Sequence, residues 1–298
     1  MCHERARIVY LKRILGSESH PEEVSTPMSQ ENEYVLGTHD AENARLLLQH
    51  RIWRPRALDA WRRAGFTVGQ MLLDVGCGPG HAAVDLAEIV GPAGRIVAID
   101  CSRRFLDTLE ATRRHRGLDQ ITPLELDLNV AGPPPGAADG AWARWIFAFV
   151  QHPRELLARI REALKPGGVL VIHEYFDYRT WRLAPRAPEI EEFVQAAMAS
   201  WRAAGGEPDI GLALPGWLAE LGFTTTSLRP ILDVVPASNF VWQWPAGYIR
   251  VGLARLVELG QMPAERARVI ADVLTAREAD PHTLMVTPAL LELIAVRQ

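Results

Sequence analysis

The stretch LLDVGCGPGH, residues 72–81, joins a short apolar run to glycine at every second position and then to the segment HAAVDLAEIV. The apolar run is typical of a buried strand in a parallel sheet, and glycine permits a sharp backbone turn into a helix. We therefore predict a strand over 71–75, a turn over 76–80 and a helix over 81–90 that ends at Gly91.

The same alternation of strand and helix continues along the chain. Further strands are predicted over 95–100, 121–128, 140–149 and 168–175, and helices over 102–117 and 153–168. Strands separated by helices of this length predict a doubly wound, Rossmann-like α/β sheet. Its ligands should bind at the carboxyl ends of the strands.

Both flanks of this core are predicted to be mainly helical. Apolar spacing from Asp40 onward indicates two helices separated at Pro55. The later elements are expected as helices over 188–204 and 214–222, a strand over 224–235, helices over 238–282, and a mixed strand-like segment up to 298.

We divide the chain into a lead-in and one domain. Residues 1–33 are polar and without periodicity, and we predict them to be disordered. We also hypothesise that the natural protein starts at Met28. The domain spans 34–298, with a helical cover (34–66), a core (67–176), its completion (177–237), a late helical insertion or lid (238–282) and a final strand (283–298).

The composition favours a cytoplasmic globular protein. Of 298 residues, 48% are hydrophobic and 23% are charged, and the formal net charge is −4. This charge lacks the basic footprint of nucleic-acid binders. The three cysteines suit neither a disulfide framework nor a zinc site, and we find no apolar run of membrane-spanning length. We therefore expect no metal, no nucleic-acid partner and no membrane.

The glycine turn is compatible with two kinds of ligand. A dinucleotide fingerprint requires a third glycine where this chain has His81, and the carboxylate of Asp74 would repel a pyrophosphate. The same carboxylate suits the ammonium of S-adenosylmethionine, whose amino-acid end also requires close backbone approach. Asp100, which ends the next strand, suits ribose hydroxyls in either cofactor and so does not discriminate between them.

Five motifs in this order resemble class I S-adenosylmethionine-dependent methyltransferases of the small-molecule type. They are LLDVGCGPGH, RIVAIDCSRRFL, LELDL, GAWARWIFAFVQHP and LKPGGVLVIHEY, and the resemblance covers roughly residues 34–175. It implies S-adenosyl-L-methionine as the cofactor.

The resemblance also implies which residues contact each part of that cofactor. They are Asp74, Gly76, Cys77 and Gly78 at the methionyl part, Asp100 at the ribose, Cys101 and Phe105 beside the adenine, Asp127 with Leu128 at the adenine amino group, and Arg144 at the methionyl carboxylate. Two alternatives stay open, a helix cap for Asp127 and a surface ion pair for Arg144. Cys77 and Cys101 are expected to be packing residues rather than nucleophiles.

The segment EYVLGTHDAENARLLLQHRIW is similar to one that precedes the first motif in methyltransferases of the ubiquinone/menaquinone-biosynthesis type. In those relatives it closes over the cofactor. The resemblance therefore implies cofactor contacts for Tyr34 and Gln49.

Two clusters are candidates for the acceptor side. His173, Glu174 and Tyr175 follow the fifth strand, and could act as a general base, position the acceptor or be satisfied locally. Ala148 and Phe149 stand where the family often has polar residues or histidine, which removes a histidine base there. Candidate pocket residues are Tyr178, Phe240, Trp242, Trp244 and Tyr248, with core packing or a dimer contact as the alternative.

We interpret the chain as a methyltransferase that acts on an O, N, S or C atom of a small organic acceptor. We expect a monomer or a homodimer. The alternatives are a protein that binds the cofactor without turning it over and an NAD(P)-dependent oxidoreductase, which would share the fold and Asp100.

Overall fold

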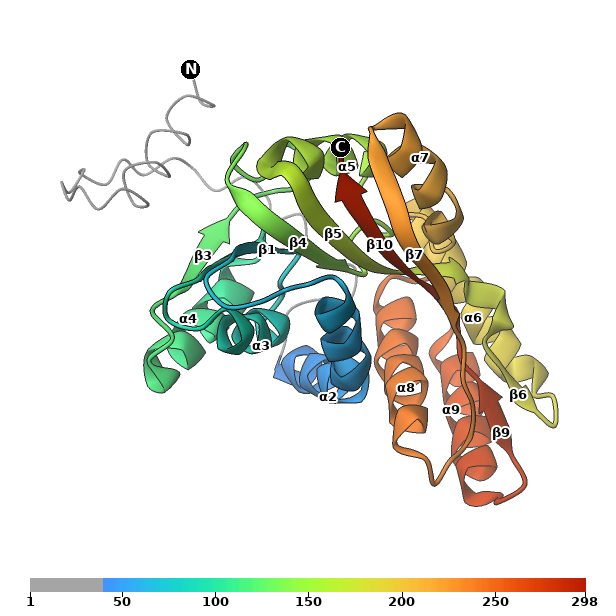
Figure 1. Cartoon of the computed structure of the whole chain (residues 1–298). Coiled ribbons are helices and arrows are strands. Elements are labelled where there is room, and N and C mark those ends of the chain that lie inside the picture. Colours follow the sequence, from blue (N-terminus) through green and yellow to red (C-terminus); the bar gives the residue numbers. More distant parts are fainter. Residues whose placement is uncertain (1–39) are drawn as a thin grey trace.

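The computed structural model describes residues 40–298, so Tyr34 and the proposed start at Met28 lie outside the described residues. A seven-stranded sheet has the order β3-β2-β1-β4-β5-β10-β7, in which β10 is antiparallel to both neighbours (Figure 1). Its strands are β1 (Met71–Val75), β2 (Arg95–Asp100), β3 (Ile121–Glu125), β4 (Ala138–Arg144), β5 (Leu164–Asp177), β7 (Phe223–Ile231) and β10 (Ala289–Arg297). The predicted doubly wound α/β sheet is confirmed.

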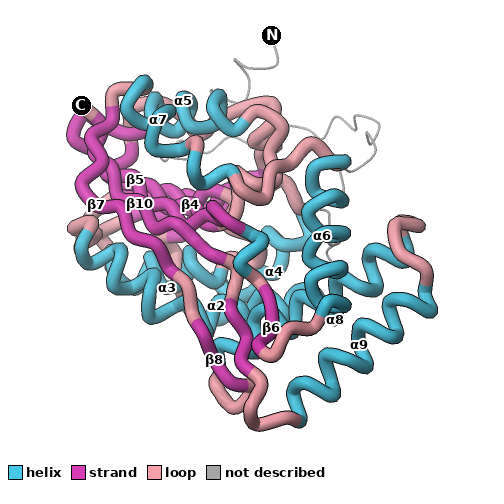
Figure 2. Tube along the Cα trace, turned by 90° about the vertical axis from the view of Figure 1, so that its right-hand side faces the viewer, coloured by secondary structure: helices cyan, strands magenta, loops and turns pink. Residues whose placement is uncertain are grey.

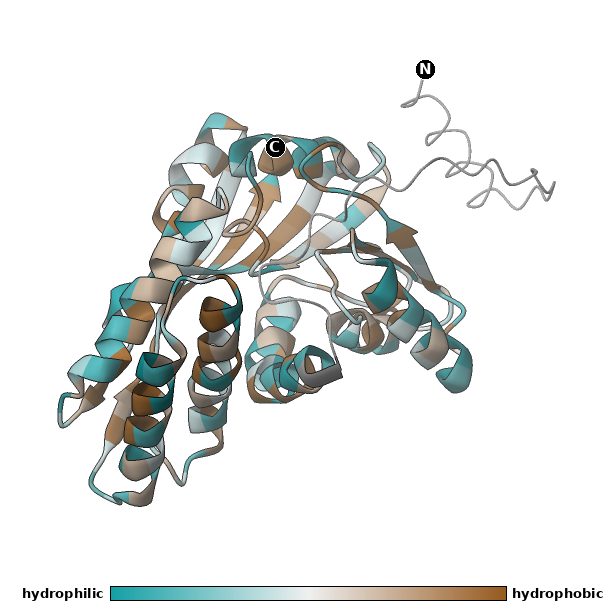
Figure 3. Cartoon of the chain, turned by 180° about the vertical axis from the view of Figure 1, so that it is seen from behind, coloured by the Kyte–Doolittle hydropathy of each residue, from teal (hydrophilic) through white to brown (hydrophobic). Residues whose placement is uncertain are grey.

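Helices cover both faces of this sheet. One face carries α3 (His81–Val90) and α4 (Arg103–Arg116), and the other carries α5 (Pro153–Ala163) and α7 (Leu214–Glu220). Alternate strand residues divide between two buried clusters, as the pleat requires. Figure 3 shows the central strands as the hydrophobic layer of the molecule.

The predicted break at Pro55 is wrong, because α2 (Asp40–Arg63) is one helix with Pro55 inside it. Proline removes one backbone hydrogen bond from a helix interior. Here both halves are buried, through Ile52 and Trp53 before the proline and Trp61 after it. Tertiary packing therefore maintains the helix across the proline.

Two predicted strands are too long. β3 ends at Glu125, and β4 ends at Arg144 instead of residue 149. Trp145 has a φ of 52°, a left-handed conformation that no strand continues. The predicted helix at 153–168 also ends early, at Ala163, where β5 begins.

A second group of elements, which we call the cover lobe, lies beyond the large sheet. It consists of the helices α6 (Pro188–Ala203), α8 (Gln243–Glu258) and α9 (Ala264–Ala279) with a three-stranded sheet of order β6-β9-β8 (Figure 2). The strands are β6 (Arg182–Ala184), β8 (Val234–Pro236) and β9 (Leu284–Val286). The sequence did not predict this sheet, and the single strand expected over 224–235 is divided between β7 and β8.

The cover lobe has an aromatic interior and packs on α2. Trp181 contacts Phe193 and Tyr248 through ring edges, and Trp201 Nε1 donates to the Tyr248 hydroxyl over 3.0 Å. On the α2 side, the Arg45 guanidinium lies 5.6 Å from the Tyr248 ring centroid. Helix α2 therefore contacts both the large sheet and the cover lobe. Among residues 40–298, no helix is long and apolar enough to span a membrane.

Candidate active site

Side chains at the carboxyl ends of β1, β4 and β5 share one face of the sheet. Asp74 pairs in register with Trp142, and Arg144 pairs with His173. Register partners on neighbouring strands lie on the same face, and so do residues two apart on one strand. Helix α2 covers this face, because Trp61 packs edge-on against Trp142 with their ring centroids 5.2 Å apart.

Asp74 is a buried carboxylate with one free oxygen. Its side chain accepts the backbone N–H of Ala83 in the first turn of α3, while Oδ2 has no hydrogen-bond partner among the described residues. The residue is 2% exposed. Burial raises the pKa of Asp74 to about 7, and Arg144 opposes this rise. A cation at Oδ2 would therefore stabilise the ionised form.

Two glycines of the turn have different roles. A Cβ added at Gly80 would lie 2.3 Å from Leu109 Cδ1, so Gly80 allows α3 and α4 to pack closely. Gly78 has a φ of 53° and would meet nothing within 4 Å, so its backbone borders open space. Cys77, which lies between Gly76 and Gly78, is buried, and burial raises the pKa of its thiol well above its usual range. This agrees with the packing role predicted for Cys77.

Asp100 joins the ends of the first two strands. Its Oδ2 accepts the N–H of Gly78 and its Oδ1 accepts the N–H of Ser102, each over 2.8 Å. Burial raises the pKa of Asp100. Cys101 is exposed beside it, so the packing role predicted for Cys101 is wrong, whereas Phe105 is buried on α4. The carboxylate is therefore held at the edge where a ribose was expected.

Asp127 lies in the turn after β3 and stabilises that turn. Its Oδ1 accepts the N–H of Asn129 over 2.9 Å and the Asn129 Nδ2 over 3.1 Å. Leu128 beside it is buried. No helix begins here, since the next helix is α5, so the predicted helix cap is wrong; the turn occupies one oxygen of Asp127 instead.

Arg144 is held from one side by a residue that the sequence analysis did not select. His50 of α2 lies with Nδ1 3.4 Å from Arg144 Nη2 and with Nε2 3.0 Å from Asp85 Oδ2. Arg54 also donates to Asp85 Oδ2 over 2.8 Å. The other guanidinium nitrogen, Arg144 Nη1, is buried and has no partner within residues 40–298. The predicted surface ion pair is not what the structure shows for Arg144.

A third unpaired atom belongs to His81, the first residue of α3. Its Nε2 is buried without a partner in the described part of the chain, and its ring centroid lies 5.6 Å from that of His50. We call Asp74, His81 and Arg144 the polar cluster. Its atoms without a hydrogen-bond partner among the described residues are one carboxylate oxygen, Asp74 Oδ2, and two nitrogens, His81 Nε2 and Arg144 Nη1. Sequence reasoning used His81 only to exclude a dinucleotide.

Of the two residues ahead of the first motif that were predicted to contact the cofactor, Gln49 and Tyr34, only Gln49 lies within the described residues. Gln49 is 8% exposed, and its Oε1 accepts a hydrogen bond from Arg45 Nη1 over 2.7 Å. Arg45 also pairs with Glu42, which is 1% exposed. Gln49 therefore belongs to a buried polar network of α2, one residue from His50, and Tyr34 lies outside the described residues.

Comparison with known proteins identifies the core of the chain. Residues 72–168 match the family model described as a methyltransferase domain. This segment is a class I methyltransferase domain. The methyltransferase domain thus runs from β1 into β5 and contains Asp74, Asp100, Asp127 and Arg144.

Individual relatives agree with this assignment. A demethylmenaquinone methyltransferase of Lactococcus lactis is 29% identical over 141 residues, which are 47% of this chain and 55% of that protein. The chain spans between a quarter and two thirds of the length of the first curated relatives it matches.

Solved structures share the fold. A putative methyltransferase of Bacillus halodurans has a TM-score of 0.56 at 14% identity, with 80% of this chain and 97% of that chain covered. The 4+2 cyclase SpnF has a TM-score of 0.50 at 18% identity, with 99% of this chain and 94% of that chain covered. At these identities the likeness concerns the fold alone.

The methyltransferase domain has groups that fit the amino-acid end of S-adenosylmethionine. An ammonium requires a free acceptor, which Asp74 Oδ2 supplies, and a carboxylate requires free donors, which Arg144 Nη1 supplies. The open backbone at Gly78 leaves room for close approach. No cluster of metal-binding residues occurs among the described residues.

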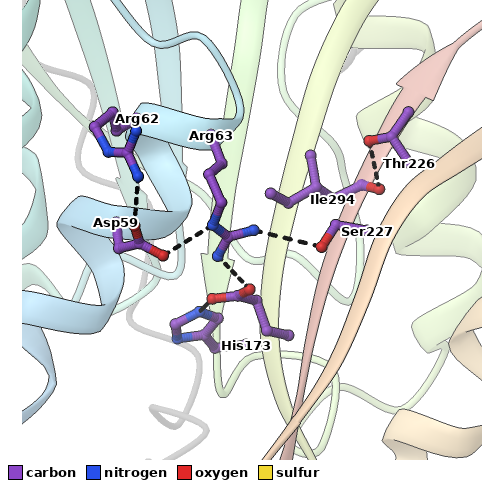
Figure 4. Close-up of polar contacts among 8 residues, drawn as sticks. Asp59, Arg62, Arg63, His173, Thr226, Ser227 and Ile294 are labelled. Atoms are coloured by element: carbon purple, nitrogen blue, oxygen red, sulfur yellow. Dashed lines mark hydrogen bonds and ion pairs between the residues drawn. The ribbon is translucent and has the colours of Figure 1, made fainter.

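His173 is in register with Arg144 on the neighbouring strand, and its ring belongs to a buried network of its own (Figure 4). Its Nε2 is 3.1 Å from Glu292 Oε2, and Glu292 also pairs with Arg63 of α2. The histidine is completely buried, with its ring 4.8 Å from that of Trp142. Its Nδ1 is buried without a partner among the described residues, so local contacts satisfy one ring nitrogen, and complete burial disfavours a general base.

Acid is expected to destabilise the protein through His173. Burial lowers the pKa of His173, so the folded state binds fewer protons at this residue than the unfolded state does. The free energy of unfolding should therefore fall as the pH drops below about 6.5, the pKa in an unfolded chain. Urea denaturation of His173→Gln between about pH 6.5 and 5 should show a weaker pH dependence than the wild type. Equal slopes would contradict this account.

Glu174 fixes the turn after β4. Its Oε2 accepts the N–H groups of Phe147 and Ala148 over 3.0 and 3.3 Å, and its Oε1 accepts the N–H of Tyr175. Burial raises the pKa of Glu174 to about 8. The side chain is completely buried, so the structure favours positioning of the turn over proton transfer to an acceptor.

The turn that Glu174 holds presents Trp145 to an aromatic cluster. The Trp145 ring is stacked 5.6 Å from Tyr175 and 5.8 Å from Trp244, and Trp53 meets Trp145 edge-on at 5.3 Å. These rings come from the turn after β4, from β5, from α8 and from α2. Trp53 and Trp145 lie within segments that resemble family motifs, but the resemblance implied no role for either ring.

The five pocket candidates do not all line one site. Tyr178 and Tyr248 belong to the interior of the cover lobe, and Trp242 is buried with its Nε1 donating to Glu278 over 2.8 Å. Phe240 is 54% exposed. Of the five candidates, Trp244 alone contacts the turn after β4 through the ring contacts above, so core packing explains the buried others.

Proposed function

We propose that the protein transfers a methyl group from S-adenosylmethionine to a small organic acceptor. The observation that carries this proposal is the polar cluster, in which a free carboxylate oxygen and free nitrogens meet at the carboxyl ends of β1 and β4. A zwitterionic amino acid has the complementary charges. Ligands of doubly wound sheets bind at this edge.

Each part of the cofactor has a candidate partner in the methyltransferase domain. Asp74 would hold the ammonium, Arg144 the carboxylate and Asp100 the ribose hydroxyls. Asp127, with Leu128, would hold the adenine amino group through the carboxylate oxygen that Asn129 does not occupy. Cys101 and Phe105 flank that position from α4 and the preceding loop.

When bound, S-adenosylmethionine supplies a methyl group on a sulfonium, which an acceptor atom displaces in line. Charge disperses in such a transition state, so the chain mainly has to align the acceptor and exclude water. Trp53 of α2 and Trp244 of the cover lobe pack against Trp145 in the turn after β4, which supports a role of both elements at this edge. We propose that the cover over 34–66 and the insertion over 238–282 shape the acceptor site.

The same site disfavours a dinucleotide. The free oxygen of Asp74 would face the pyrophosphate, and no compensating cation occupies Oδ2 in the described residues. The net charge of −4 also favours a small molecule over a nucleic acid as acceptor. We further propose a cytoplasmic monomer or homodimer.

Asp100→Ala should weaken binding of S-adenosylhomocysteine by about 2 kcal/mol, or about 30-fold, because two hydroxyls lose their acceptor. Isothermal titration calorimetry of the wild type, Asp100→Ala and Asp100→Asn measures this. Asp119→Ala, at an exposed loop position, is the matched control and should bind as the wild type does. Unchanged affinity of Asp100→Ala, or tighter binding of NADH than of S-adenosylhomocysteine, would refute the proposal.

Turnover requires a separate measurement, because the SpnF likeness shows that this fold also occurs in a protein named as a cyclase. In a panel of phenols, amines, thiols and carboxylic acids, we expect at least one compound to receive radiolabel from methyl-labelled S-adenosylmethionine. One S-adenosylhomocysteine should form for each methyl group transferred. Tight binding without any release of S-adenosylhomocysteine would favour a non-catalytic binding protein.

A further inference from the structure

Two histidines lie at the polar cluster, His81 as a member and His50 as a neighbour. Their hydrogen-bond partners assign them different roles. His50 comes from α2 and His81 from the first turn of α3, with ring centroids 5.6 Å apart. Neither belongs to the candidate residues that the sequence indicated. Both lie beside Arg144, and burial, with a smaller contribution from Arg144, lowers the pKa of each.

The partners of His50 fix its tautomer. Asp85 Oδ2 accepts from Nε2, which leaves the Nδ1 lone pair to accept from Arg144 Nη2. His50 is therefore a neutral positioning residue. It holds one half of the guanidinium, while Nη1 has no partner among the described residues.

His81 differs because its Nε2 has no partner in the described part of the chain. The charged groups that face it are Arg144 from β4, Asp85 from α3 and Arg51 from α2, with His50 beside it. Burial, together with the neighbouring His50 and Arg144, lowers the pKa of His81 to about 4. Without an anion, His81 is therefore neutral near pH 7.

We propose that His81 and Arg144 together form the anion-binding end of the polar cluster, and that His81 takes up a proton from solvent when a carboxylate binds there. This inference rests on the proposed function, because the carboxylate is that of the cofactor's amino-acid end. Nε2 becomes a donor, so the carboxylate receives charge-assisted hydrogen bonds from two side chains. The nearby Asp74, at 2% exposure, receives the ammonium.

The two ends of the polar cluster respond to pH in opposite directions. A carboxylate at His81 raises the histidine pKa, so this end gains affinity as the pH falls. An ammonium at Asp74 requires the ionised carboxylate, whose pKa is about 7 in the free protein, so that end loses affinity as the pH falls. The contribution of His81 is therefore visible as a difference between the wild type and a variant at one pH.

The test compares two ligands on the full chain. S-Adenosylhomocysteine carries the amino-acid end, and 5′-methylthioadenosine lacks it. We expect His81→Gln to weaken S-adenosylhomocysteine about tenfold or more and to leave 5′-methylthioadenosine within about twofold. Calorimetry at pH 6.5 in two buffers of different ionisation enthalpy should also show that the wild type takes up more protons than His81→Gln, by up to about one per site.

Three outcomes separate the possibilities. If the wild type binds neither ligand, the proposed function fails. If it binds both, and His81→Gln leaves the affinity for S-adenosylhomocysteine and the proton uptake unchanged, the role of His81 is refuted while the function stands. An equal loss for both ligands would also refute it. His115→Gln on the exposed surface of α4 is the matched control, and His81→Asn replaces His81→Gln if binding of 5′-methylthioadenosine shows that the latter is unfolded.

Discussion

Trp53→Ala is expected to lower the free energy of unfolding by about 3–5 kcal/mol. Trp53 is completely buried on α2, edge-on to Trp145 at 5.3 Å and to Trp244 at 4.8 Å, with the Arg56 guanidinium 4.7 Å from its ring. Truncation removes a large apolar surface from three elements at once. Because those elements are α2, the turn after β4 and α8, the resulting cavity cannot close by moving one of them.

Urea denaturation followed by far-ultraviolet circular dichroism measures this loss. Trp53→Phe keeps an aromatic ring and should lose less stability. Trp217→Ala, at a half-buried position of α7, controls for the loss of a tryptophan from a less buried site. A loss for Trp53→Ala no larger than that for Trp217→Ala would contradict the packing role.

Glu292→Ala is expected to cost a similar amount, about 3–5 kcal/mol, because it breaks a buried ion pair from one side. Glu292 is 3% exposed and lies between Arg63 and His173. Figure 4 shows Arg63 reaching from α2 to this carboxylate. Removal leaves the guanidinium without its buried partner and detaches the end of α2 from β5 and β10.

Two variants test whether the buried charge is responsible. Glu292→Gln keeps the shape and one acceptor and should fall between the wild type and Glu292→Ala. Asp59 also pairs with Arg63, but its side chain is 46% exposed. Asp59→Ala should therefore have a much smaller effect. Equal losses for Asp59→Ala and Glu292→Ala would show that burial is not the deciding factor.

The large sheet could be predicted because its signals are local. The strand and helix around 72–81 follow from one apolar run, one glycine turn and one amphipathic segment, all adjacent in sequence. The small sheet could not be predicted in this way. Its strands have three residues each, and β6 pairs with β9 about a hundred positions away, so no local pattern reports the pairing.

Helix α2 shows the limit of a local rule. Pro55 predicts a break, but burial of Ile52, Trp53 and Trp61 outweighs the lost hydrogen bond. That burial depends on the sheet and on α8, which lie far from Pro55 in sequence. Propensity alone therefore gives the wrong boundary.

The candidate site was easiest to predict at the ends of strands. Asp100 and Arg144 end β2 and β4, Asp74 lies one residue before the end of β1, and Asp100 contacts the glycine turn that follows β1 through Gly78. His50 and Asp85 were missed because they meet only after α2 folds across α3. A histidine in a helical pattern carries no signal of a partner 35 positions away.

The position of α2 has a consequence for enzyme kinetics. The helix contributes His50 beside Arg144 and, five residues earlier, Arg45 against Tyr248 of the cover lobe. Under the proposed function, the first contact concerns the cofactor and the second concerns the elements around the acceptor. A substitution in this helix should therefore change the Michaelis constants of both substrates together, whereas a substitution in α4 or in α9 should change only one.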